Sequence, residues 1–314
     1  MLGYPDLQRV ITSNLRRVPA ASEAGDLQYG GRTLEAAAGF WMGCKSRGTR
    51  ELPLRPSTRG AVAFVRVLLG LPRIEVRLSD ETAGRRIGEH LRVRVFGVLP
   101  KHRVAQGVLA VPPSMGAYLS GRSRQAVRTN TARAARAGIA VSRLVTLEAR
   151  RDAVDRYTGP APALVDREWR DEWWRRAAED GRVWLAASNP DGQIQGLLVA
   201  TVDLDWAMLE VAIARQHCTR WLLQKVLLQH LVDSGVRYMF TGTGNVLSLG
   251  PSLRHIQRLL GYVVANLAVS ANPPSAPSAP AWAVAAATNA TLVAAREQHP
   301  EAVDAVLPQL DAIS

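Results

Sequence analysis

The stretch from Trp206 to Tyr262 decides the fold. It reads WAMLEVAIA at 206–214, RQHCTRWLLQKVLLQHLVDSG at 215–235, VRYMF at 236–240, TGTGN at 241–245 and PSLRHIQRLLGY at 251–262. Residues 206–214 are apolar and suited to strands, which predicts a buried strand. Apolar residues then recur at helical spacing as far as Gly235, which predicts a helix that ends at the glycine. Because 236–240 predicts another short strand, the stretch predicts one crossover between two parallel strands.

This crossover places the amino terminus of its helix at the carboxyl ends of the two strands. Unpaired backbone N–H groups and the helix dipole attract anions there. We therefore expect the turn to bind an anion. The residues expected to bind it are Arg215, His217, Thr219 and Arg220.

The same turn resembles the GNAT acyltransferase superfamily, which has R/Q-x-x-G-x-G/A here, followed by a leucine-rich helix. This sequence reads Arg215-x-x-Cys218-x-Arg220, followed by Leu222 and Leu223. The first basic residue is in register, whereas both glycines are replaced. In the family these glycines let the backbone wrap the pyrophosphate of acetyl-CoA. The resemblance therefore implies the fold more strongly than it implies acetyl-CoA. It also implies that the anion at this turn belongs to an acyl donor, so Arg215, His217, Thr219 and Arg220 are the expected donor-binding residues.

The elements predicted from residue 139 to 270 also follow the GNAT order, which is βααβββαβαβ. The segment from Tyr118 to Gly138 is similar to the helix that opens the catalytic lobe of Fem-type and CelD/BcsL-like GNAT proteins. We expect an α/β protein with a GNAT fold, in which a mixed sheet is flanked by helices. The catalytic lobe is expected to be C-terminal to a basic, degenerate GNAT-like lobe.

Composition divides the chain into four regions. We expect a basic N-terminal domain at 1–115, a catalytic domain at 116–270, a Pro/Ser/Ala linker at 271–281 and a helical extension at 282–314. Within the first region, apolar runs predict strands at 62–69, 74–78, 91–98 and 104–111. The last two are expected to form a hairpin around the turn at 100–103.

The overall composition is that of a globular protein. Hydrophobic residues make up 47% of the chain, and no segment reaches the length of a transmembrane helix. Cys44 and Cys218 do not form a disulfide framework, so we expect a cytoplasmic protein without a membrane partner. The six histidines and two cysteines are scattered, so no metal site is expected.

The net charge of +12 is unevenly distributed. Residues 1–147 carry 24 Lys and Arg against 9 Asp and Glu, whereas residues 148–314 carry 15 against 18. Such a basic half suits a polyanion such as tRNA. The residues expected to bind RNA are Arg122, Arg124, Arg128, Arg133 and Arg136. Two alternatives stay open: an ordinary solvated helix, and the arginine excess of a GC-rich genome, since only three basic residues are lysines.

Several residues are candidates for the chemistry. Glu210, a carboxylate inside an apolar strand, corresponds to the general base of many GNAT relatives, with a paired structural glutamate as the alternative. Asn245 follows two glycines and is expected to orient a ligand. The proton-donating tyrosine of the family corresponds to Gln257, which cannot act in that way. Trp169 and Trp173 share one helix face and predict an acceptor pocket, with core packing as the alternative.

Three functions fit these features. The preferred one is transfer of an aminoacyl group from aminoacyl-tRNA to a small-molecule or peptide amine, as in natural-product biosynthesis, with no permanently bound cofactor. This function accounts for the lost glycines, the missing tyrosine and the basic half together. The alternatives are an acyl-CoA-dependent N-acyltransferase and a non-catalytic GNAT-like module that binds RNA or protein.

Overall fold

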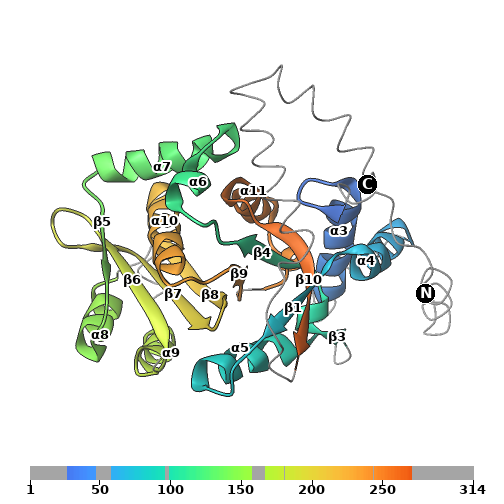
Figure 1. Cartoon of the computed structure of the whole chain (residues 1–314), viewed down its shortest axis with the longest axis horizontal. Helices are drawn as coiled ribbons and strands as arrows, with labels where there is room; N and C mark the ends of the chain where they lie inside the picture. Colours follow the sequence, from blue (N-terminus) through green and yellow to red (C-terminus); the bar gives the residue numbers. More distant parts are fainter. Residues whose placement is uncertain are drawn as a thin grey trace.

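The computed structural model (Figure 1) describes residues 27–46, 58–95, 99–157, 167–179, 181–242 and 244–270. The expected linker at 271–281 and the helical extension at 282–314 lie outside the described residues.

The C-terminal half has the element order that the sequence predicts. Its elements are β5 (Ala140–Arg143), α8 (Leu147–Arg156), α9 (Arg167–Ala177), β6 (Arg182–Ser188), β7 (Ile194–Asp203), β8 (Trp206–Ala214), α10 (His217–Asp233), β9 (Tyr238–Thr241), η5 (Val246–Ser248), α11 (Pro251–Leu260) and β10 (Val263–Ser270). Apart from the single 3-10 turn η5, this is βααβββαβαβ. The order implied by the GNAT resemblance is confirmed.

The N-terminal half is more helical than the sequence predicts. Its elements are α3 (Arg32–Ser46), α4 (Thr58–Gly70), β1 (Arg73–Arg77), α5 (Thr82–Arg92), β2 (Arg94–Val95), β3 (Leu99–Pro100), η2 (Lys101–Arg103), β4 (Gln106–Ala110), α6 (Met115–Leu119), η3 (Arg122–Arg124) and α7 (Gln125–Arg136). The strands predicted near 74–78 and 104–111 are confirmed as β1 and β4.

Two other predictions in this half are wrong. The strand predicted at 62–69 lies inside α4, where Ala63, Phe64 and Val67 are buried at helical spacing. The valines of this run favour strands, but burial of one helix face against α3 decides the conformation. Of the strand predicted at 91–98, the described residues contain only β2, because Leu91 is the buried last-turn residue of α5. The hairpin expected between this strand and 104–111 is not formed, since β2 pairs with β3 at 99–100, whereas β4 pairs with β9 and β10.

All the long strands belong to one eight-stranded mixed sheet. The strand order is β1-β10-β4-β9-β8-β7-β6-β5. β4 lies antiparallel between β9 and β10, and β1 pairs with β10 in parallel. Two strands from before residue 115 are therefore built into the sheet of the C-terminal half. The domain boundary expected at residue 115 therefore separates strands that belong to the same sheet.

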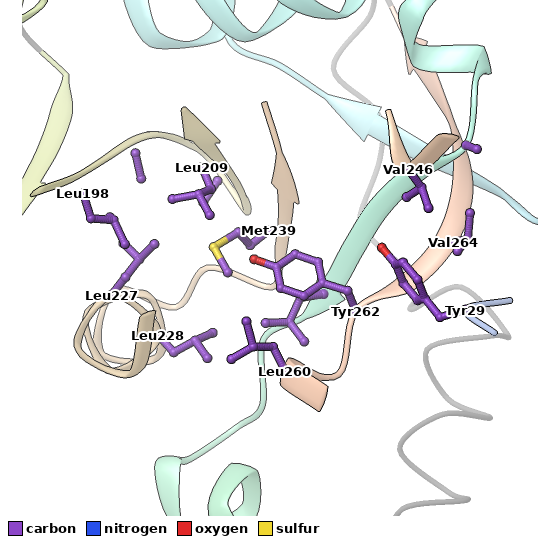
Figure 2. Close-up of a cluster of buried hydrophobic side chains, with 14 of the residues drawn as sticks. Tyr29, Leu198, Leu209, Leu227, Leu228, Met239, Val246, Leu260, Tyr262 and Val264 are labelled. Carbon is purple, nitrogen blue, oxygen red and sulfur yellow. The ribbon is translucent and has the colours of Figure 1, made fainter. Parts of the chain in front are cut away.

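Helices cover both faces of this sheet. Leu209 and Met239 point to the face covered by α3, α4, α6, α7, α10 and α11, and Figure 2 shows this part of the core. Their neighbours Met208 and Phe240 point to the opposite face, against α5. On that second face, α8 and α9 cover the other end of the sheet. Alternation along each strand thus buries apolar side chains on both sides, as a central sheet requires.

Candidate functional site

The candidate site lies where two parallel strands part. β8 and β9 pair from Trp206 opposite Tyr238 to Leu209 opposite Thr241, but β8 continues along β7 as far as Ala214. We call this place the strand fork. The carboxyl ends of parallel strands are where open α/β sheets bind ligands.

A β-bulge marks the same place. Val199 of β7 pairs with Val211 and Ala200 pairs with Leu209, so Glu210 is an extra residue in β8. Bulges re-aim side chains at the ends of strand pairing and are frequent next to functional sites. The bulge therefore sets Glu210 at the mouth of the strand fork.

On one side of the fork, α10 begins without a side-chain cap. Its N-cap residue Gln216 is extended, and in the described part of the chain its side chain makes no capping hydrogen bond. The hydroxyl of Thr219 is fully buried in the first turn and has no hydrogen-bond partner among the described residues. No side chain of the described residues therefore caps the first-turn N–H groups, and anion binding at this helix end stays a prediction.

The predicted donor-binding residues lie together around this helix start. Arg215 and His217 are exposed, and the His217 ring accepts a hydrogen bond of 3.2 Å from Trp221 Nε1. Burial lowers the pKa of Arg220 from its usual value, and the charge of Tyr157 opposes that change. Burial likewise raises the pKa of Tyr157, whereas Arg215 and Arg220 lower it.

Tyr157, at the end of α8, is thus a fifth member of this group that sequence reasoning missed. No local pattern could reveal it, because it reaches the turn only through the packing of α8 beside the sheet.

The replacement at Cys218 has a packing explanation. Cys218 is buried in the hydrophobic core, although it occupies a position where the family carries glycine. Its side chain therefore packs into the core beneath the turn at 215–220. The loss of glycine does not remove the anion-attracting helix end.

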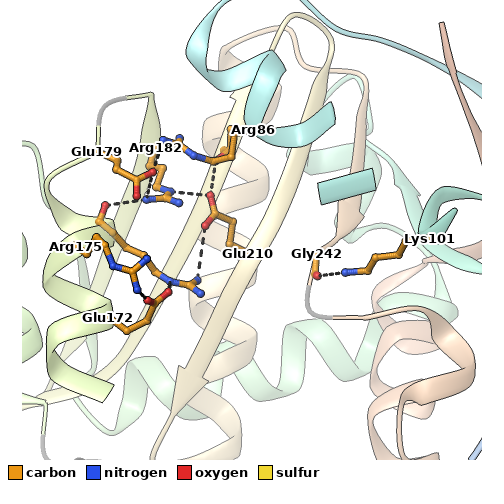
Figure 3. A network of polar contacts seen from close by, with 10 residues as sticks. Arg86, Lys101, Glu172, Arg175, Glu179, Arg182, Glu210 and Gly242 are labelled. Carbon is orange, nitrogen blue, oxygen red and sulfur yellow. Dashed lines mark hydrogen bonds and ion pairs between the residues drawn. The ribbon is translucent and has the colours of Figure 1, made fainter. Parts of the chain in front are cut away.

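On the opposite face, Glu210 is the centre of an ion-pair network (Figure 3). Its Oε1 accepts hydrogen bonds from Thr201 Oγ1 and, at 2.8 Å, from Arg182 Nε. Its Oε2 lies 3.8 Å from Arg176 Nη1. Arg182 in turn lies 3.0 Å from Glu179, which also pairs with Arg86. These partners offset the free-energy cost of burying the Glu210 carboxylate. Oε2 has fewer close partners than Oε1.

The N-terminal half contributes a second polar group near the fork. Lys101 Nζ lies 2.8 Å from His90 Nε2 and donates to the carbonyl of Gly242 at 3.1 Å. Burial and the neighbouring Lys101 lower the pKa of His90 to about 4, while Glu210 acts in the opposite direction. His90 is therefore neutral at pH 7. Sequence reasoning missed both residues, since only the tertiary fold brings α5 and η2 to the end of β9.

Other predicted site residues have structural partners. Asn245 is buried, and its side chain accepts a hydrogen bond of 2.9 Å from the Ser248 N–H, so it caps η5. Trp173 is buried against Trp184, with ring centroids 5.7 Å apart, which is the core packing that the sequence left open. The side chain of Trp169 lies outside the described residues. Gln257 accepts a hydrogen bond from the Tyr29 hydroxyl.

The predicted RNA-binding arginines all lie on η3 and α7. Arg122, Arg128, Arg133 and Arg136 are exposed. Arg124 is half-buried, with its guanidinium 5.2 Å from the centre of the Tyr118 ring and a hydrogen bond of 3.3 Å to the carbonyl of Leu259.

The described ranges contain neither a metal-binding cluster nor a membrane-spanning helix. No group of three or more His, Cys, Asp or Glu side chains is arranged there so that it could hold a metal ion. No helix within those ranges has the length and apolar character needed to cross a bilayer.

The sequence matches no protein-family model and no curated protein. Among solved structures, the chain is similar to the C-terminal domain of a putative lysylphosphatidylglycerol synthetase from Agrobacterium fabrum, with 13% identity and a TM-score of 0.38 over 61% of this chain and 64% of that one. L-PGS from Bacillus licheniformis gives 11% identity and a TM-score of 0.35 over 60% and 65%.

A tandem GNAT protein from the clavulanic acid biosynthesis pathway gives 16% identity and a TM-score of 0.33 over 55% of this chain and 54% of that one. Each of these matches covers less than two thirds of the other protein's chain. These likenesses are too distant to carry an argument about function.

Proposed function

We propose that the protein is a GNAT-fold transferase that moves an aminoacyl group from aminoacyl-tRNA to the amine of a small molecule or peptide. The strand fork is the observation that carries this proposal. It places an uncapped helix end with Arg215, His217 and Arg220 on one side of the sheet, and Glu210 on the other. A donor and an acceptor can therefore approach the same opening from opposite faces.

The chemistry assigned to the fork is a direct displacement. The acceptor amine attacks the ester carbonyl, a carbon–nitrogen bond forms, and the bond from that carbon to the ribose oxygen breaks. The amine loses a proton and the released ribose hydroxyl gains one. The α10 helix end holds a phosphate near the ester, and Glu210 Oε2 accepts the amine proton.

An acyl-CoA donor is the second candidate, because the same helix end would suit a pyrophosphate. Two features favour tRNA over CoA. Cys218 and Thr219 are packed in the core where the CoA turn of the family has room for a close approach, and arginine-rich α7 packs directly on α10.

The test is to incubate the full chain with a pool of amines and either tRNA charged with labelled amino acids or labelled acetyl-CoA. Ribonuclease-treated samples serve as controls, and mass spectrometry identifies the labelled amides. We expect amides from charged tRNA only, and their loss after ribonuclease treatment. Acetylated products, or micromolar acetyl-CoA binding by calorimetry, would replace tRNA with CoA as the donor. If no labelled amide forms with either donor and acetyl-CoA does not bind, the result would support the non-catalytic module.

The role of Glu210 is tested with a matched pair of variants. Glu210→Gln is expected to lower kcat by about 10²–10⁴-fold with little change in donor KM, because a positioned base is lost. Glu179→Gln removes a carboxylate of the same ion-pair network away from the bulge, and should leave kcat within a few-fold. Equal effects of the two variants on kcat and on thermal stability would make Glu210 a purely structural carboxylate.

A further inference from the structure

Two sets of arginines in the described ranges differ in their partners. The first set lies on α5, α8, α9 and β6, and its members pair with carboxylates. These pairs are Arg86–Glu179, Arg156–Asp152, Arg170–Asp155, Arg175–Glu172, Arg176–Glu172, Arg176–Glu210, Arg182–Glu179 and Arg182–Glu210. The charge of this set is neutralised within the protein.

The second set has no carboxylate partner within the described ranges. It lies on η3, α7 and α11, and we call it the arginine edge. Its arginines are Arg122, Arg124, Arg128, Arg133, Arg136 and Arg258, and His255 lies beside Arg258. Neither residues 101–147 nor residues 251–260 contain an Asp or Glu, so no acidic side chain of these segments offsets the field of the edge.

Packing makes these residues one continuous surface. α11 packs against both η3 and α7, and Figure 1 shows α7, α6 and α11 following one another along one side of the molecule. The Arg124 guanidinium bridges the junction, since it donates to Leu259 at the end of α11. His255 and Arg258 are exposed on the same face of α11, with Arg258 Nη2 3.2 Å from His255 Nδ1.

Arg128 is also held in place by the backbone around it. Arg128 donates to the carbonyls of Leu119 and, at 2.9 Å, Gly121. The apolar positions of α7, Val127 and Ala134, face inward and are fully buried. The exposed side of α7 thus presents the guanidiniums of Arg128, Arg133 and Arg136, and planar guanidinium forks match phosphate oxygens.

The neighbours of the arginines indicate what kind of polyanion fits. The exposed positions between them on α7 are Thr129, Ala132 and Ala135. A membrane-surface helix would turn large apolar side chains outward, and single-strand readers would present aromatic rings for base stacking. α7 does neither, so it suits a phosphate backbone read by position and charge. Its 12 residues span about 18 Å, the length of roughly five phosphates of one strand.

We propose that the arginine edge binds the phosphate backbone of a folded RNA by shape and charge, without reading its bases. This proposal rests on the proposed function for the identity of that RNA as tRNA. Because α7 packs on α10, the edge would hold the body of the RNA while its aminoacylated end reaches the strand fork.

The test measures binding of uncharged tRNA to the full chain by fluorescence anisotropy over a series of salt concentrations. Arg133→Gln with Arg136→Gln, and separately Arg258→Gln, are compared with a control pair, Arg156→Gln with Arg175→Gln. We expect the first double variant to weaken binding and to lower the salt slope by about 2, and Arg258→Gln to lower it by about 1. The control pair, which removes the same charge from ion-paired positions, should bind like the unmodified protein.

Three outcomes would overturn the proposal. The first is that the control pair weakens tRNA binding as much as the edge variants do, and the second is that tRNA binding does not change with salt. The third is that anionic phosphatidylglycerol vesicles bind as well as tRNA and that the edge variants weaken this vesicle binding. Equal binding of a DNA duplex of matched sequence would show that the edge binds any duplex backbone. That result would also reject RNA as its specific ligand. The assay needs no turnover, so tRNA binding without transfer would reject the proposed function and leave the edge intact. Transfer that is unaffected by the edge variants would reject the arginine edge as the tRNA-binding surface and leave the proposed function intact.

Discussion

His90 shows how the fold sets the chemistry of a single side chain. It lies on α5 with its ring 6.5 Å from that of Phe240, and Lys101, Glu210 and the Gly242 carbonyl face it from η2, β8 and the end of β9. Burial and Lys101 lower its pKa from 6.5 to about 4. Because its folded-state pKa is below the unfolded value, the unfolded chain binds more protons between these two pH values.

Stability should therefore fall as the pH drops from about 6.5 to about 4, with this one group contributing a slope of up to about 1.4 kcal/mol per pH unit. We expect His90→Gln to flatten that part of the curve while the region above pH 7 keeps its shape. Urea unfolding at a series of pH values measures this slope. An unchanged slope in His90→Gln would mean that His90 is not buried in its neutral form.

At the scale of elements, the uncapped start of α10 gives the next prediction. Gln216 is exposed and extended, so Gln216→Ser or Gln216→Asp can supply the missing cap. Either should stabilise the free protein by about 0.5–2 kcal/mol, as measured by thermal unfolding.

The same caps should raise the donor KM, because they occupy the N–H groups assigned to the donor phosphate. Gln216→Asp should raise it more than Gln216→Ser, since its charge also repels the phosphate. Stabilisation without any change in KM would show that the donor does not bind at this helix end.

The start of α5 is a joint between the two halves of the chain. Asp203, at the end of β7, accepts hydrogen bonds from the backbone and hydroxyl of Ser79, at 2.8 and 2.5 Å. Gly84 leaves no room beside this joint, since an added Cβ would lie 2.3 Å from the Ser79 carbonyl and 2.8 Å from Asp203 Oδ2.

Gly84→Ala should therefore destabilise the protein by about 1–3 kcal/mol through overpacking. Gly39→Ala is the matched control, because Gly39 is an exposed residue inside α3 with nothing within 4 Å of an added Cβ. That control should be stabilising by up to about 1 kcal/mol. Chemical denaturation compares the two variants. A Gly84→Ala variant as stable as the unmodified protein would show that the contact between Ser79 and Asp203 relaxes to accommodate the added methyl group.

At the scale of the whole molecule, the shared sheet predicts that the C-terminal half cannot fold alone. A fragment of residues 116–270 lacks β4 and β1, so β10 would lose both neighbours and β9 would lose its partners Val108 and Leu109. Such unpaired central strands expose apolar faces and backbone groups. We expect the fragment to show no cooperative thermal transition by circular dichroism. A sharp transition with dispersed amide proton signals would mark 116–270 as an independent domain.

Local sequence patterns were sufficient to predict the order of elements from residue 139 to 270 and the position of the turn before α10. Both depend on neighbours a few residues apart: the helical spacing of leucines after Thr219, the glycine at 235 and the turn at 189–192. Where a local signal was ambiguous, as in the valine-rich run at 62–69, sequence reasoning predicted a strand in place of α4.

Contacts between distant segments could not be predicted from local patterns and became known from the three-dimensional arrangement. It placed β4 between β9 and β10, brought His90 and Lys101 to the strand fork, and set Tyr157 beside the turn at 215–220. It also decided which arginines are neutralised and which are not, since Arg182 and Glu210 are 28 positions apart in the chain. The physical reason is that sheet partners and ion pairs are selected by how whole surfaces bury together, and spacing along the chain does not record that choice.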